Sequence, residues 1–389
     1  MSKVLGFRFG AVSAGIRKDG RIDLALAVCD RPAVTAALFT RNLVRAAPVL
    51  VAAERASAGV ARAVLANAGC ANAVTGEQGL QAVRSTTQAV AKALGISPEE
   101  VLPASTGVIG AHLPVEKINA QAEALAAKLS PQGHEDFAQA ICTTDRWVKI
   151  AEAEAEGAKV LAIGKGAGMI HPDVGALPHA TMLVFIFTDA VVEQPVLARA
   201  LGEACEVTFN ACSVDGDTST NDTVVVMASG ASDKRPSEAA LTAALTQVCD
   251  KLARSMVADG EGSNHVAEIK VRGLASKADA KAAAKTIATS MLVKTALFGE
   301  DANWGRLLAA AGRAGVAFDP RVAAISIGGI QIVKDGAPIG AEAELRANEI
   351  LKQPSYTIEL TLGSGPGEFR YLTSDLGHGY VDVNAGYRS

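Results

Sequence analysis

The sequence lacks several features that would place it in a familiar functional class. It has no run of Lys and Arg, and its net charge of -4 argues against a nucleic-acid-binding surface. Its apolar runs, such as Met182–Phe187, are much shorter than the roughly 20 residues needed to cross a bilayer. The N-terminal stretch MSKVLGFRFGAVSAGIRKDG contains no apolar segment of signal-peptide length. These absences predict a cytoplasmic protein.

The cysteines give no sign of a metal site or a disulfide framework. None of the six belongs to a CxxC pair, and in a cytosolic protein scattered cysteines usually behave as small buried apolar residues. No metal ligand set is therefore predicted. The cysteines are Cys29, Cys70, Cys142, Cys205, Cys212 and Cys249.

The motifs of several enzyme classes are also missing. There is no GxSxG elbow of the α/β-hydrolases and no HExxH zinc motif. The segment Gly164–Gly168, GKGAG, fits neither the phosphate-loop pattern nor the GxGxxG dinucleotide pattern. No histidine has an obvious triad partner, so a general base other than histidine is expected.

What the chain does contain is an alternation of strand-like and helix-like segments, which predicts an α/β protein with mixed or antiparallel sheets. A hairpin is expected over Val148–Ile163, with its turn at Glu156–Gly157. The predicted helices are Gln78–Leu94, Val115–Leu129, Val196–Phe209, Glu238–Ala258, Asp279–Ala296 and Glu342–Lys352. The other predicted strands are Ala37–Asn42, Pro48–Ala52, Ala61–Ala68, Met182–Phe187, Thr223–Ala228, Val266–Val271, Val322–Ile332 and Tyr356–Leu362.

The clearest catalytic signal is ATMLVFIFTDA, Ala180–Ala190, in which a threonine opens a very apolar strand. In N-terminal-nucleophile enzymes, a Ser, Thr or Cys becomes the first residue of a buried strand after the preceding peptide bond is cut. The new α-amine, with a pKa near 8, then serves as the base for the hydroxyl of the same residue. A threonine at a strand edge is also an ordinary β-forming residue, so this segment alone leaves both interpretations open.

Several segments together resemble the glutamate N-acetyltransferase (ornithine acetyltransferase) family of arginine biosynthesis. They occur in the family's order and span nearly the whole chain. They are STGVIG (Ser105–Gly110), TTDRWVK (Thr143–Lys149), KGAGMIHP (Lys165–Pro172), ATMLVFIFTDA (Ala180–Ala190), FNACSVDGDTSTNDT (Phe209–Thr223), DGEG (Asp259–Gly262), DANWGR (Asp301–Arg306) and YVDVNAGYRS (Tyr380–Ser389).

The resemblance implies an αββα layered fold and self-cleavage between Ala180 and Thr181. The products would be an α-chain, residues 1–180, and a β-chain, residues 181–389, assembled as two of each. Thr181 matches the nucleophile. Thr106 and Gly107 match an oxyanion hole formed by a hydroxyl and a backbone N–H; by themselves, without the resemblance, these two residues favour an ordinary turn.

The resemblance also implies a set of substrate contacts, whose residue types suit an amino-acid derivative. Lys165 is expected to pair with an α-carboxylate and Glu261 with the cationic side-chain amine of ornithine. The alternative interpretation of Lys165 and Glu261 is that each is a solvent-exposed charge on a loop. The implied contacts are Thr143, Thr144, Lys165, Thr181, Glu261, Asn384 and Ser389.

The reaction implied is transfer of acetyl from N-acetylornithine to glutamate through an acetyl-threonine ester, without a metal or redox cofactor. Some members of the family also accept acetyl-CoA. Two other classes stay open: an amidohydrolase or aminopeptidase of the same architecture, and a binding protein without catalysis.

Three positions depart from the common family pattern. Gly175–His179 is an insertion directly before the predicted cut. Cys70 replaces an asparagine, and Ser389 replaces a terminal threonine while keeping the hydroxyl.

Overall fold

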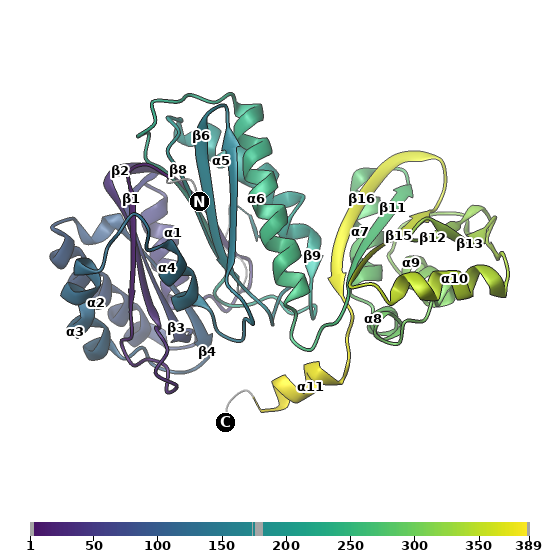
Figure 1. Ribbon diagram of the computed structural model, residues 1–389, viewed down its shortest axis with the longest axis horizontal. Helices are drawn as coiled ribbons and strands as arrows, with labels where there is room; N and C mark the ends of the chain where they lie inside the picture. Colours follow the sequence, from purple (N-terminus) through teal and green to yellow (C-terminus); the bar gives the residue numbers. More distant parts are fainter. Residues whose placement is uncertain (1–3, 173, 176–181, 387–389) are drawn as a thin grey trace. The chain divides into compact units, whose positions relative to one another are not determined.

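The computed structural model describes residues 4–172, 174–175 and 182–386. The chain forms two compact units (Figure 1). Unit 1 comprises Met1–Asn210 and Asp217–Met256, and unit 2 comprises Ala211–Gly216 and Val257–Ser389. Each unit has its own sheet and its own helices.

Unit 1 contains a mixed sheet that has nine strands in the described part of the chain. Its order is β4-β3-β2-β10-β8-β6-β5, with β1 and β7 also paired to β2. The strands are β1 (Phe7–Val12), β2 (Leu24–Thr40), β3 (Val60–Cys70), β4 (Val101–Val108), β5 (Lys149–Ala155), β6 (Ala158–Lys165), β7 (Val174–Gly175), β8 (Leu183–Thr188) and β10 (Thr223–Ala228). The helices are α1 (Ala47–Ala56), α2 (Gly76–Leu94), α3 (Val115–Ala127), α4 (His134–Ile141), α5 (Gln194–Glu206) and α6 (Glu238–Ala258), with short 3-10 turns at Pro98–Glu100 and Phe209–Ala211.

The middle of this sheet is buried on both faces. Strands β8 and β10 run parallel, and every residue of both is buried. Parallel strands that are covered on both faces have continuous apolar sequences, without alternation of polar and apolar residues. This explains the sequence LVFIFT of β8. The helix α4 packs on β1, β2 and β6 and closes the core there.

Aromatic rings fill the space beneath α4. Phe137 of α4 packs edge-on against Phe9, Phe185 and Phe187, with ring centroids 6.1, 5.5 and 6.4 Å away. Edge-to-face pairs at these separations are favourable beyond the area that they bury. In a chain with 4% aromatic residues, this cluster is a concentrated source of core stability.

Unit 2 contains a second mixed sheet, with the order β14-β13-β12-β15-β11-β16-β9 among its described strands. The strands are β9 (Cys212–Ser213), β11 (Val266–Gly273), β12 (Ala324–Ile327), β13 (Ile330–Lys334), β14 (Ala337–Pro338), β15 (Ser355–Thr361) and β16 (Gly365–Ser374). The helices are α7 (Lys277–Ala288), α8 (Met291–Phe298), α9 (Trp304–Gly312), α10 (Ala341–Leu351) and α11 (His378–Ala385), with a 3-10 turn at Pro320–Val322.

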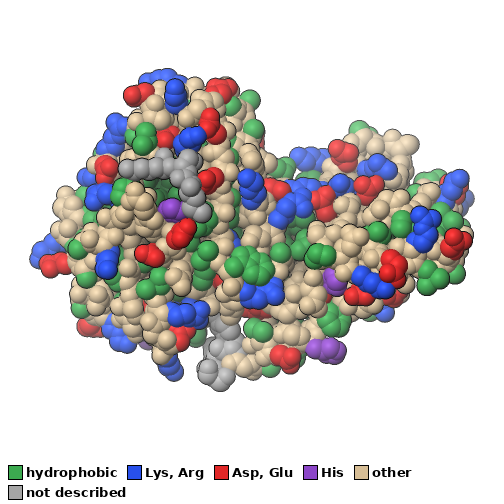
Figure 2. All heavy atoms as spheres, viewed as in Figure 1, with side chains coloured by type: hydrophobic (Ala, Val, Ile, Leu, Met, Phe, Trp, Pro, Cys, Tyr) green, Lys and Arg blue, Asp and Glu red, His purple; other side chains and the backbone are tan. Residues whose placement is uncertain are grey.

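One face of the second sheet is apolar and the other is charged. Along β11, Ala267, Ile269 and Val271 are buried in a core shared with α7, α9 and α10. The residues between them carry charge and form ion pairs with neighbouring strands, such as Glu268 with Arg370 at 3.6 Å. This period-two alternation is typical of a sheet covered on one side. On the side of the molecule drawn in Figure 2, Lys and Arg side chains are interspersed with Asp and Glu.

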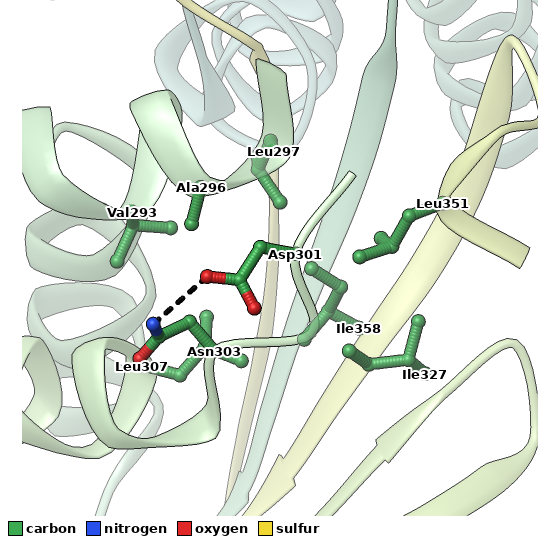
Figure 3. Close-up of a pocket in the computed structure, with 9 residues that line it drawn as sticks. All are labelled: Val293, Ala296, Leu297, Asp301, Asn303, Leu307, Ile327, Leu351 and Ile358. Atoms are coloured by element: carbon green, nitrogen blue, oxygen red, sulfur yellow. Dashed lines mark hydrogen bonds between the residues drawn. The ribbon is translucent and has the colours of Figure 1, made fainter. Parts of the chain in front are cut away.

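The DANWGR segment organises the helices of unit 2. Figure 3 shows Asp301 and Asn303 beside a cavity of about 10 Å³ whose other lining side chains are apolar. Asn303 donates to Asp301 at 3.0 Å and its amide oxygen accepts from the N–H of Arg306, which caps α9. Trp304 donates to Glu344, and Arg306 to the carbonyl of Leu292. The cavity has room for about one water molecule, so this segment is structural.

The α/β class with mixed sheets is confirmed, and most of the predicted elements are present. The hairpin turns at Glu156–Gly157 as expected, and α6 has the predicted bounds. None of the helices in the described ranges is long and apolar enough to cross a membrane.

Three predicted elements are wrong. Pro48–Ala52 is not a strand but part of helix α1, where Pro48 occupies the first turn and needs no N–H donor. The predicted helix Asp279–Ala296 is two helices, α7 and α8. They separate at Thr289 and Ser290, where Thr289 is the C-cap of α7 and Ser290 is the N-cap of α8.

The predicted strand Val322–Ile332 is a hairpin, β12 and β13, that turns at Gly328–Gly329. Both glycines have positive φ, 55° and 82°, as the tightest hairpin turns require. The glycine-rich loop also begins later than predicted, because Gly164 and Lys165 belong to β6.

We expect Phe137→Ala to lower the free energy of unfolding by about 3 to 5 kcal/mol, because it empties the centre of the aromatic cluster. Leu43→Ala is a suitable control, since Leu43 is 95% exposed, and should change it by less than about 0.5 kcal/mol. Urea unfolding followed by circular dichroism measures both. Equal effects of the two substitutions would contradict the role of the cluster.

Candidate active site

The first part of the site is an irregularity where β3 and β4 end. Thr106 and Gly107 lie inside β4, so the turn interpretation is wrong. The register of the parallel pair shifts at Gly69 and Cys70, opposite Gly107. Gly107 has φ +131°, and a Cβ there would lie 2.4 Å from the carbonyl carbon of Gly69. The close approach of the two backbones therefore requires glycine at position 107.

Buried amide side chains hold this irregularity in place. Asn67 donates to the carbonyl of Cys70 at 2.9 Å and accepts from the Ser105 hydroxyl at 2.6 Å. Asn221, far along the chain, donates to the carbonyls of Ala71 and Ser105 at 2.7 and 2.9 Å. Asn221 is not among the site residues predicted from the sequence. Its position in the FNACSVDGDTSTNDT segment was the available signal.

The second part of the site is the ammonium group of Lys165 at the end of β6. Lys165 is 4% exposed, and its Nζ donates to Thr143 Oγ1 at 2.8 Å and to Thr106 Oγ1 at 3.2 Å. The side chain of Thr106 is itself buried. Residues from three different segments thus meet at one ammonium group. Thr144 is half-buried beside Thr143, in the segment between α4 and β5.

The third part, which sequence reasoning missed, is the carboxylate of Asp145. One oxygen accepts from Lys149 Nζ and from the N–H of Gly166, both at 2.7 Å. The other accepts from the N–H of Thr143 at 2.9 Å and lies 4.0 Å from Lys165 Nζ. The side chains of Asp145 and Lys149 are fully buried. Their spacing of four in TTDRWVK was the available signal.

The charges around Asp145 decide its ionisation. Burial by itself would raise the pKa of the Asp145 carboxyl, but the nearby cations Lys165 and Lys149, with the N–H donor of Thr143, lower that pKa to about 2. Asp145 is therefore ionised at neutral pH. Its negative charge lies 2.7 Å from the ammonium group of Lys149 and 4.0 Å from that of Lys165.

Unit 2 brings together two other predicted contacts. Asn384, in α11, donates to Glu261 Oε2 at 2.8 Å. The approach is close, because a Cβ on Gly262 would lie 2.2 Å from the backbone nitrogen of Tyr380. The segment that follows β16 is thus folded against the DGEG loop.

Ala180, Thr181 and Ser389 lie outside the described residues, as do the inserted residues 176–179.

The segment Asp215–Asp222 is rich in acidic residues. Among the residues that the structure describes, no group of three or more His, Cys, Asp or Glu side chains is placed to hold a metal ion.

Comparison with known proteins identifies the family. The ArgJ family matches residues 8–389. The chain belongs to the ArgJ family. The predicted relationship to the ornithine acetyltransferases of arginine biosynthesis is thereby confirmed.

Relatives of high similarity cover the whole chain. The "Arginine biosynthesis bifunctional protein ArgJ" of Nitratidesulfovibrio vulgaris is 47% identical over 392 residues, which covers 99% of this chain and 98% of the relative. The protein of the same name from Geobacter sulfurreducens is 44% identical over 396 residues, covering 99% and 100%.

A crystal structure of the ArgJ protein from Bacillus halodurans is 40% identical, with a TM-score of 0.50. It covers 52% of this chain and 98% of that chain. The layered α/β fold expected for the ornithine acetyltransferase type is therefore confirmed for this ArgJ member.

We expect Asp145→Asn to lower the free energy of unfolding at pH 7 by about 3 to 5 kcal/mol, because it removes the negative charge beside the buried ammonium groups of Lys149 and Lys165. Asp30→Asn is the control. Asp30 pairs with Arg8 at 2.9 Å, but the side chains are 57% and 41% exposed, so its loss should cost at most about 1 kcal/mol.

The effect of Asp145 should also depend on pH. Its folded-state pKa of about 2 lies below the ordinary 3.8, so its stabilising contribution is complete above pH 3.8 and is lost as the pH falls toward 2. Denaturant unfolding of wild type and variant across this range should show the difference shrinking at low pH. A difference that stays constant would contradict the assigned ionisation.

Proposed function

We propose that this ArgJ member transfers acetyl from N-acetylornithine to glutamate, with Thr181 as the nucleophile. One observation supports this above the others. Leu183, two residues after Thr181 in the sequence, is the cross-strand partner of Lys165, whose ammonium group contacts Thr106. The predicted nucleophile therefore lies two positions along the chain from the residue of β8 that pairs with Lys165.

The proposed chemistry proceeds in two steps through one covalent ester. The α-amine of Thr181 takes the proton of its own hydroxyl, and Oγ attacks the acetyl carbonyl of N-acetylornithine. The Thr106 hydroxyl and the Gly107 N–H stabilise the oxyanion, each donor of this kind being worth about 3 kcal/mol. Ornithine leaves, and the amino group of glutamate then attacks the ester to give N-acetylglutamate.

The proposal includes a cut between Ala180 and Thr181. The α-chain, residues 1–180, and the β-chain, residues 181–389, would stay together because β8 and β10 pair with β6 and β2 in one sheet. The solved Bacillus halodurans chain agrees with such a cut, since it spans 52% of this chain while 98% of its own length is matched. Residues 181–389 also make up slightly more than half of the sequence. Assembly as two α and two β chains, and a cytoplasmic location, are parts of the same proposal.

The substrate contacts are proposed from the family resemblance. Glu261 supplies negative charge for the ornithine side-chain amine, and Asn384 holds that carboxylate through its 2.8 Å hydrogen bond. Thr143, Thr144 and Lys165 lie near Thr106 in unit 1, and Ser389 completes the proposed set. Because relatives at 44–47% identity carry the word bifunctional in their names, acetyl-CoA is proposed as a second donor.

We expect intact mass spectrometry under denaturing conditions to resolve two chains whose masses place the break before Thr181. Thr181→Ala should give one uncut chain, because the attacking hydroxyl is gone. Thr188→Ala, at the far end of β8, is a matched control and should be cut. A single uncut wild-type chain would contradict the proposal.

Assays of the cut protein should separate the remaining possibilities. N-acetylornithine with glutamate should give ornithine and N-acetylglutamate, and acetyl-CoA with glutamate should give the same product. Free acetate released without an acceptor would favour the amidohydrolase interpretation, in which water resolves the ester. No turnover with either donor would favour a binding protein.

A further inference from the structure

The start of β11 and the end of β16 lie side by side in the second sheet, where Val266 pairs with Ser374. The chain enters β11 from the loop that carries Glu261, and it leaves β16 toward α11, which carries Asn384 (Figure 1). The contacts at this edge of the sheet therefore determine how Glu261 and Asn384 meet. Their own link is a single 2.8 Å hydrogen bond.

The carboxylate of Asp375 joins the two segments. Asp375 is 2% exposed and directly follows β16. Its Oδ1 accepts from the Ser263 hydroxyl at 2.9 Å and from the N–H groups of Asn264 and His265 at 2.9 and 3.0 Å. The N–H of Asp375 donates in return to the carbonyl of His265 at 3.2 Å. Three consecutive residues, beginning two positions after Glu261, are thus bound to one carboxylate oxygen.

The side chain of Lys294, in α8, holds the chain immediately before Asp375. Lys294 is 2% exposed. Its Nζ donates to Thr373 Oγ1 at 3.0 Å, to Ser374 Oγ at 3.3 Å and to the carbonyl of Ser374. Its own carbonyl accepts from the N–H of Leu376 at 3.2 Å. Lys294 therefore contacts the chain on both sides of Asp375.

The charge of Asp375 also stabilises this contact. Burial lowers the pKa of Lys294 to about 8, and the carboxylates of Asp375 and Asp215 act in the opposite direction. A buried cation is costly unless negative charge and hydrogen-bond acceptors lie near it. The same carboxylate thus binds the segment after Glu261 and stabilises the ammonium group that fixes the end of β16.

From these contacts we propose that Asp375 is a positioning residue of the subsite for the cationic side-chain amine of the substrate. It fixes the loop of Glu261 against the segment that leads into α11, so that Asn384 reaches the Glu261 carboxylate and orients it toward the amine. Asp375 acts through Glu261 and not by contact with the substrate. The inference rests on the proposed function, because it takes Glu261 as the partner of that amine.

A double-mutant cycle on ornithine binding tests this role. Isothermal titration calorimetry with L-ornithine is carried out on the wild type, on Asp375→Asn, on Glu261→Gln and on the double variant. Asp375→Asn keeps an oxygen that accepts hydrogen bonds but removes the charge. We expect it to weaken ornithine binding by about tenfold, and to have little further effect when Glu261→Gln is present, because residues of one network are coupled. Asp335→Asn is the control, since Asp335 is an exposed carboxylate of the same unit, and it should leave the affinity unchanged.

A purely structural role of Asp375 predicts a different pattern. The loss of Asp375 would then weaken binding by the same factor with and without the Glu261 carboxylate, and equal factors would overturn the proposal. Wild-type ornithine affinity in Asp375→Asn would overturn it as well. Kinetics provide a second measurement, because the proposal expects KM for N-acetylornithine to rise in Asp375→Asn with little change in kcat. A lower kcat at unchanged KM would contradict it.

A second variant keeps the test decisive if Asp375→Asn does not fold. Ser263→Ala retains the carboxylate and removes one of its three donors. We expect ornithine binding about twofold to fivefold weaker, again only while the Glu261 carboxylate is present. Wild-type affinity in Ser263→Ala would overturn the proposal. Failure of the proposed function looks different, because Glu261→Gln alone would then bind ornithine as tightly as the wild type.

Discussion

The carboxylate of Asp145 is the interaction on which the rest of the candidate active site depends. It accepts from Lys149, from the N–H of Thr143 and from the N–H of Gly166, and so ties the segment before β5 to the end of β6. Two buried ammonium groups are tolerable only because this charge lies between them. The ammonium group of Lys165, 4.0 Å from this carboxylate, donates to the hydroxyl oxygen of Thr106.

Backbone geometry also determines where the residues of the candidate active site lie. The shift in register between β3 and β4 places Thr106 and Gly107 where the regular ladder is interrupted, and irregularities of this kind often lie beside active sites. Asn221 reaches the same point from a distant segment and satisfies two carbonyl groups there. In unit 2, a hydrogen bond joins Asn384 of α11 to Glu261. Glycine at position 262 allows α11 to approach the loop that carries Glu261 closely.

Periodicity predicted the long helices and the β5–β6 hairpin because each buries one face along its own length. It failed where a segment was short or interrupted. Five residues at Pro48–Ala52 are too few to distinguish a helical from a strand period. The apolar pattern of Asp279–Ala296 continues across the break between α7 and α8 at Thr289 and Ser290. At Gly328–Gly329 the sequence contains a turn signal, but the predicted strand Val322–Ile332 included both glycines.

The sequence by itself determined the family and the identities of the predicted reacting residues, because these depend on short motifs whose order along the chain is directly readable. It also determined that no histidine has an obvious triad partner. Only the tertiary structure decided that Lys165 contacts Thr106, since 59 residues separate them in the chain and no local pattern encodes their distance. The role of Asp145 was likewise decided by folding, because a carboxylate acquires its function here from burial among cations that strands from different segments bring together.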